Sequence, residues 1–99
     1  MSDETPGFAA PPFDAEAALV VLRRQLRELR PLTERGMRYE IRGQSVIELG
    51  VADQAITARL AKRPARAPDW TQQRLQSSLD ARRFVDQVKQ LLPRWERDE

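Results

Sequence analysis

Prolines and glycines divide this chain into short segments, and their positions restrict the elements that it can form. A proline inside a helix clashes with the carbonyl group four residues earlier, so helices are expected to end near Pro31, Pro64 and Pro93. Three glycines recur at equal spacing between residues 36 and 50. Each internal glycine weakens a helix by about 1 kcal/mol. We therefore expect helices before the three prolines and a non-helical segment around the glycines.

A first helix is predicted over about 14–30. Asp14 is suited to cap its N-terminus because a short acidic side chain accepts hydrogen bonds from the first free amide groups. The residues that follow include leucines at spacings of three and four, which lie along one side of a helix. These are Leu19, Leu22, Leu26 and Leu29. The sequence therefore predicts an amphipathic helix that contributes one apolar stripe to a core.

A β-hairpin is predicted over about 37–50, because Met37, Tyr39 and Ile41 alternate with charged residues. A turn at 43–45 would place Ile47 and Leu49 on the same face as these three side chains. A two-residue turn would instead place them among the charges. An alternative stays open, since residues 45–48 match a capping box and would start a helix at residue 45.

The remaining chain is predicted to be helical. Ile56 and Leu60 favour a helix over 52–63, followed by a stiff linker over 63–68. A long or broken helix is expected over 69–92, with the break near residues 77–78. The fold expected is a predominantly α-helical small single domain of three to four helices with the short hairpin at 37–50; an all-α bundle is the alternative. Residues 1–13 are expected to form a disordered arm, 14–95 the domain and 96–99 a frayed tail.

Composition excludes several kinds of chemistry. The 99 residues include no cysteine and no histidine, so the chain holds no disulfide, thiolate nucleophile or Cys/His zinc site. The glycine spacing fits neither a P-loop nor a dinucleotide fingerprint. We predict no enzyme, no cofactor, no metal and no small-molecule substrate. The acidic, proline-containing N-terminus is no secretory signal and no apolar run could span a membrane, so a cytoplasmic location is expected.

The basic residues are concentrated in the middle of the chain. Residues 20–66 carry 11 bases and 5 acids, and arginine greatly outnumbers lysine, as in the proteins of GC-rich bacterial genomes. Within this region, the segment 49–60 resembles the turn and second helix of a helix-turn-helix, with a Gly-Val pair at the turn and apolar residues at positions 56 and 60. The resemblance implies that the cations on and after that helix contact phosphates. These are Arg59, Lys62, Arg63 and Arg66.

Two functions are therefore expected. The first is a non-enzymatic protein–protein interaction module, which includes association with a second copy of the chain. Leu75 and Leu79 fall opposite the main apolar stripe of the last predicted helix, and Trp70 could anchor such an interface. The alternative is a small nucleic-acid-binding regulator that uses the helix-turn-helix-like segment at 49–66.

Overall fold

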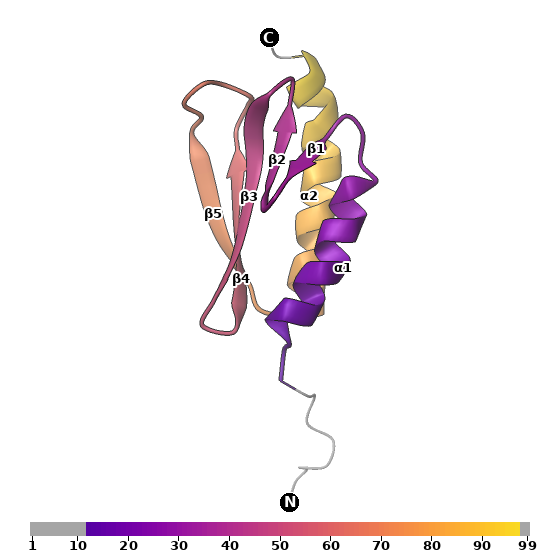
Figure 1. Ribbon diagram of the computed structural model, residues 1–99, viewed down its shortest axis with the longest axis vertical. Helices are drawn as coiled ribbons and strands as arrows, with labels where there is room; N and C mark the ends of the chain where they lie inside the picture. Colours follow the sequence, from indigo (N-terminus) through magenta and orange to yellow (C-terminus); the bar gives the residue numbers. More distant parts are fainter. Residues whose placement is uncertain (1–11, 98–99) are drawn as a thin grey trace, which may run out of the picture.

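The computed structural model describes residues 12–97, which form one antiparallel sheet with two helices on one of its faces (Figure 1). The strand order is β1-β2-β3-β4-β5, so each strand pairs with its neighbours in sequence. In chain order the elements are α1 (Ala15–Arg27), β1 (Thr33–Arg35), β2 (Arg38–Ile41), β3 (Gln44–Ala52), β4 (Ala55–Ala61), β5 (Trp70–Leu75) and α2 (Ser78–Arg97). The fold class is therefore α+β, and both the predominantly helical prediction and the all-α alternative are wrong.

Helix α1 forms where the leucine pattern predicts a helix. The Asp14 carboxylate accepts a hydrogen bond from the Ala17 amide at 3.1 Å and so caps the N-terminus. Leu22 and Leu26 are buried against the sheet. The helix ends at Arg27, three residues earlier than predicted, where the Glu28 amide bonds back to the carbonyl of Gln25.

The hairpin over 37–50 is present as β2 and β3, but its turn differs from the prediction. Ile41 pairs with Gln44, and both intervening residues have positive φ angles, 52° for Arg42 and 80° for Gly43. This is the two-residue turn that matches strand twist. Tyr39 pairs with Ile47 and the next residue of β2 pairs with residue 45, so Val46 is an extra residue, a β-bulge. Because of this extra residue, the side chains of Ile47 and Leu49 lie on the face that the helices cover, although the turn has only two residues.

The helix predicted over 52–63 is wrong, because residues 44–61 form the hairpin β3–β4. Asp53 and Gln54 make its turn with φ angles of 53° and 61°, a conformation usually supplied by Asn-Gly. Ile56 and Leu60 are four residues apart and satisfy helical spacing, but with Ala58 they also satisfy the two-residue period of a strand. Pairing with β3 and β5 decides between the two periods. Residues 49–66 contain no helix, so the helix-turn-helix interpretation of this segment is also wrong.

The long helix predicted over 69–92 is replaced by β5 and α2. The break near residues 77–78 is confirmed, since the Ser77 hydroxyl accepts from the Asp80 amide at 3.0 Å and starts α2. Pro93 does not end α2, which continues to Arg97. Trp95 stabilises this last segment, because its indole is fully buried and donates to the Ala61 carbonyl at 3.2 Å. Arg42 donates to the carbonyls of Trp95 and residue 96, where a cation favours a helix end.

The core lies between the sheet and the two helices. Its largest fully buried side chains come from all three parts, namely Leu22, Leu26, Tyr39, Val46, Ile41, Ile47, Ile56, Leu75, Phe84, Val88 and Trp95. Of the predicted arm, residues 1–11 lie outside the described part, as do residues 98–99 of the predicted tail. Neither helix within 12–97 combines the length and apolar character that crossing a bilayer requires.

Candidate functional site

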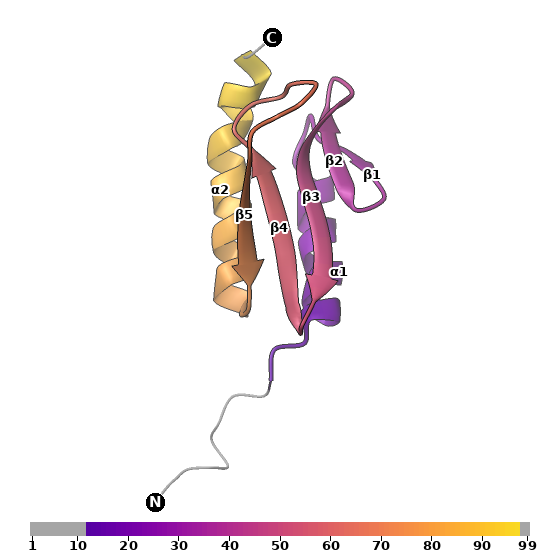
Figure 2. The same cartoon turned by 90° about the vertical axis from the view of Figure 1, so that its left-hand side faces the viewer.

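The face of the sheet opposite the helices is uncovered, and it carries polar side chains from every strand. Figure 2 shows this open face, with both helices behind the strands. The cross-strand register places five residues in one row from edge to edge, which are Arg35, Arg38, Glu48, Arg59 and Gln72. Neighbouring strands lie about 4.8 Å apart, so this row spans about 19 Å. We call this surface the open face.

Ion pairs engage some of the charges on the open face. An Arg59 guanidinium nitrogen lies 2.9 Å from Glu48 Oε1, and Arg35 Nε lies 3.4 Å from Glu40 Oε1. Three further arginines make no hydrogen bond or ion pair with the described residues. They are Arg38 in the row of five residues, Arg74, which pairs with Thr57 across β5 and β4, and Arg66 in the loop between β4 and β5. The open face therefore presents unpaired guanidinium groups to solvent.

Trp70 supplies an aromatic surface beside these charges. It is partly exposed at the start of β5, and the Arg59 guanidinium carbon lies 4.7 Å from the centre of its ring. This cation–π contact and the ion pair with Glu48 both restrain the Arg59 side chain. The Arg59 guanidinium therefore lies against the Trp70 ring.

Gly50 contributes no side chain to the neighbouring cross-strand row, which also contains Thr57 and Arg74. A Cβ atom at this position would lie 2.9 Å from Thr57 Oγ1, closer than real side chains approach. Gly50 and Thr57 are paired across β3 and β4, so the threonine side chain occupies the space above the glycine. Next to the row of five residues described above, the open face therefore has no side chain at position 50 and is covered there only by Thr57.

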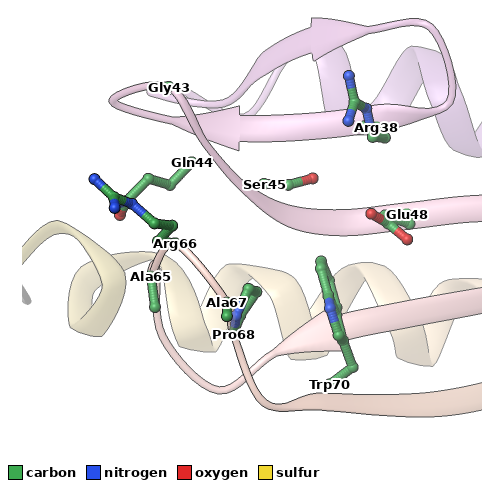
Figure 3. A pocket seen from close by; sticks show the side chains of 10 residues that line it. All are labelled: Arg38, Gly43, Gln44, Ser45, Glu48, Ala65, Arg66, Ala67, Pro68 and Trp70. Atoms are coloured by element: carbon green, nitrogen blue, oxygen red, sulfur yellow. The ribbon is translucent and has the colours of Figure 1, made fainter.

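A depression of about 580 Å³ lies at one end of the open face, between the β2–β3 turn and the β4–β5 loop (Figure 3). Its lining residues are Arg38, Gly43, Gln44, Ser45, Glu48, Ala65, Arg66, Ala67, Pro68 and Trp70. Ser45 Oγ is buried and has no hydrogen-bond partner among the described residues. A buried hydroxyl without a partner is unfavourable by about 1–3 kcal/mol, so a bound group that reached and paired with this atom would remove that cost.

The four cations predicted from sequence to contact phosphates lie at this end of the molecule. Arg59 lies on β4, whereas Lys62, Arg63 and Arg66 belong to the exposed β4–β5 loop, which a hydrogen bond from Lys62 to the Asp69 carbonyl closes at 3.0 Å. Residues 12–97 hold all 17 basic residues but only 11 of the 15 acidic ones, since Asp3, Glu4, Asp98 and Glu99 fall outside. The described part therefore carries a formal charge of +6.

The residues predicted for a protein interface are not brought together. Leu75 is 2% exposed and belongs to the core, and Trp70 lies on the open face. Leu79 is 49% exposed in the first turn of α2, on the helical side of the molecule. Each of the three therefore has a different environment.

A titratable cluster lies on the covered side and has a structural role. The Tyr39 hydroxyl donates to Glu34 Oε2 at 2.6 Å, and Arg23 and Arg27 each contact the same carboxylate. Burial, together with the hydrogen bond to Glu34, raises the pKa of Tyr39 to about 12. Burial alone would raise the pKa of Glu34, but the hydrogen bonds from Tyr39 and Arg23 outweigh it and lower that pKa below its usual value. This cluster joins α1 to β1 and β2.

Sequence reasoning missed Arg38, Ser45, Glu48 and Arg74 as candidate site residues. The alternation of 37–42 places Arg38 on the polar face of its strand, but which residues of β3 lie beside it depends on the bulge at residue 46. Arg74 falls in the helix predicted over 69–92, so the sequence gives no indication of its pairing with Thr57.

Within residues 12–97, no group of three or more acidic side chains is placed to hold a metal ion. Comparison of the chain with protein-family models, with curated proteins and with solved structures finds no match.

Proposed function

We propose that this protein binds single-stranded nucleic acid on the open face of its sheet. The observation that carries this proposal is the gathering of arginines from the strands and from the β4–β5 loop around one tryptophan. Arg38, Arg66 and Arg74 have no partner among the described residues. Phosphate groups complement the arginines, and an aromatic ring stacks with any base. The five residues that the strand pairing aligns form a row from one edge of the sheet to the other, and a nucleic-acid strand can follow this row.

A single strand suits this surface better than a duplex. On the open face the described elements offer no helix that could enter a major groove, since α1 and α2 both pack on the opposite face of the sheet (Figure 1). Stacking on Trp70 requires an unpaired base, which a duplex does not offer. The helix-turn-helix mode is thus replaced by a sheet surface, while Arg59, Lys62, Arg63 and Arg66 keep their proposed role as phosphate ligands.

The test is the salt dependence of binding. Fluorescence anisotropy of a labelled oligonucleotide of about 12 residues would be measured between about 50 and 200 mM salt. For single strands, each phosphate contact adds about −0.7 to the slope of log K against log salt. We expect the double variant Arg38→Gln/Arg74→Gln to weaken binding and to make this slope shallower by about 1.4.

A matched control variant removes the same number of positive charges from the helical side of the molecule. Arg82 and Arg83 are exposed on α2, and the double variant Arg82→Gln/Arg83→Gln should leave affinity and slope unchanged. Equal losses in both double variants would mean that only net charge matters and would contradict an open-face site. Absence of oligonucleotide binding at low salt would reject the function, and a duplex bound as tightly as a single strand would contradict the stacking role of Trp70.

A second candidate function, self-association through α1, is favoured by a different observation. Val20 is 63% exposed and Val21 42% exposed, so this part of α1 presents apolar surface to solvent. Glu16 and Arg24 lie four residues before and after Val20, and neither forms an ion pair with the described residues. We propose that a second copy docks here with α1 antiparallel about Val20, because Glu16 of each copy then faces Arg24 of the other.

Molecular mass measured over a dilution series tests this second candidate. Val20→Glu should give a monomer at concentrations where the native chain is a dimer, whereas Gln90→Glu on the exposed side of α2 should not. Reversing either charge alone should weaken the dimer, and the double reversal Glu16→Arg/Arg24→Glu should restore it. A native chain that stays monomeric at every concentration would reject the dimer.

A further inference from the structure

We propose that the depression beside Trp70 holds one base of the bound strand and selects bases that carry an exocyclic amino group. This inference rests on the proposed binding of single-stranded nucleic acid and adds a specificity that the open face as a whole does not provide. A volume of about 580 Å³ falls within the range of small-ligand sites and accommodates a base with part of its sugar.

Trp70 provides the stacking surface of this site. Its ring lines the depression (Figure 3), whereas Arg59 does not, although the Arg59 guanidinium lies against the ring. Ala67 and Pro68 of the β4–β5 loop line the depression together with the ring (Figure 3). A base in the depression would stack on the part of the ring that the guanidinium leaves free, beside these loop residues.

Two polar side chains of β3 face a base in that position. Ser45 Oγ is buried without a partner, and a hydroxyl can either donate or accept. The Glu48 Oε1 atom accepts from Arg59, while no hydrogen bond to the described residues engages Oε2. An ionised carboxylate only accepts, so Oε2 requires a donor on the ligand.

That requirement separates the bases. Cytosine, adenine and guanine each carry an exocyclic amino group that can donate to a carboxylate oxygen. Thymine and uracil present carbonyl oxygens at their exocyclic positions. Their ring N3–H can donate, but it lies between two carbonyl oxygens, so a carboxylate that accepts from it also approaches a second acceptor. The site therefore favours amino-bearing bases over thymine and uracil.

The phosphate groups on either side of the bound base have partners at the margin of the site. Arg38 and Arg66 both line the depression, one from β2 and one from the β4–β5 loop, and neither forms an ion pair with the described residues (Figure 3). They lie on different elements, so phosphates on either side of the bound base can each meet one of them. This arrangement suits a base within a strand, where phosphates flank the nucleoside.

The test compares oligo(dC) with oligo(dT) of equal length at neutral pH. We expect the native chain to bind oligo(dC) at least about 10-fold more tightly, as a hydrogen bond to a charged group predicts. Glu48→Gln should abolish this preference, because the amide can donate to a thymine carbonyl. Arg74→Gln is the matched control, which should lower both affinities by the same factor and leave their ratio unchanged. Circular dichroism would establish that each variant is folded.

Three results would overturn the inference, and they are distinguishable. Equal affinity of the native chain for the two oligonucleotides would reject base selection while leaving strand binding intact. A preference that persists in Glu48→Gln would reject the assignment of Glu48. Cytidine monophosphate that displaces the strand at stoichiometric concentration would assign the depression to a free nucleotide. Failure to bind either oligonucleotide would instead reject the proposed function itself.

Discussion

The two faces of the sheet are built from alternate residues of the same strands, yet their chemistry is opposite. In β4, Ile56 and Leu60 are buried under the helices, while Thr57 and Arg59 lie partly exposed on the open face. Within residues 12–97, the buried side-chain polar atom without a partner, Ser45 Oγ, belongs to the depression on the open face. We therefore expect substitutions on the covered face to lower the free energy of unfolding. Substitutions on the open face should instead weaken nucleic-acid binding and change stability little.

The two tryptophans illustrate the same difference. Trp95 is fully buried on the covered side and its indole nitrogen donates to a backbone carbonyl. Trp70 is partly exposed and contacts a guanidinium group instead. One ring fills the core, and the other presents a surface.

The largest expected effect comes from removing the buried ring. Trp95→Ala should lower the free energy of unfolding by about 3–5 kcal/mol, because it leaves a cavity and an unpaired carbonyl. Trp70→Ala should cost only about 1 kcal/mol, the magnitude of an exposed cation–π contact. Urea denaturation followed by circular dichroism measures both. Similar losses would show that the two faces do not differ in stability as we describe.

The next prediction concerns Tyr39, the single tyrosine of the chain. Its pKa is raised to about 12 from 10.0, so its ultraviolet ionisation should have a midpoint near 12 in the folded protein and near 10 in urea. The unfolded chain loses this proton first, so stability should decrease as pH rises from 10 towards 12. An ionisation midpoint near 10 in the folded protein would contradict the buried hydrogen bond to Glu34.

Two glutamates, one on each side of the sheet, sharpen the comparison at acid pH. The lowered pKa of Glu34 means that its stabilising effect is fully present above its usual value of 4.5 and is lost as pH falls through the folded-state pKa. Glu34→Gln should therefore destabilise the protein by about 1–3 kcal/mol at pH 7, since three side chains lose a charged partner. It should also flatten the decrease in stability between pH 5 and pH 3.

Glu48→Gln is the control for that measurement. Among the described residues Glu48 has a single partner, and the pair is partly exposed, so the substitution should change stability by no more than about 1 kcal/mol. An equal effect of the two glutamates would contradict the assignment of stability to the covered side.

The smallest expected effect is on the unpaired arginines. Arg38→Gln/Arg74→Gln should leave the free energy of unfolding within about 0.5 kcal/mol of the native value, because neither side chain has a partner to lose among residues 12–97. The same variant is expected to weaken nucleic-acid binding. A large loss of stability here would assign these arginines to the fold rather than to binding.

Local sequence predicted the elements whose signals are short-range. Asp14 caps α1 as expected, the break at residues 77–78 is capped by Ser77, and a hairpin occupies 37–50. The prediction failed where one pattern satisfies two periods. Ile56 and Leu60 fit a helix or a strand equally, and only the positive φ angles of Asp53 and Gln54 make the turn that commits them to a strand.

The candidate site was predictable only in part. The sequence names Arg59, Lys62, Arg63 and Arg66 as phosphate contacts through the resemblance of 49–60 to a helix-turn-helix, and the helix of that motif is absent. The sequence does not name Arg38, Ser45 and Glu48, because their meeting depends on strand register. The single extra residue at 46 decides which side chains of β3 lie opposite those of β2.

The sequence by itself determined the absence of cysteine and histidine chemistry and the capped start of α1, because these depend on composition or on residues close along the chain. The tertiary structure alone decided that residues 55–61 and 70–75 are strands, that Leu75 is buried, and that Trp70 shares a face with Arg38. Strand pairing joins residues far apart in sequence, and its free energy belongs to the assembled sheet rather than to any one segment.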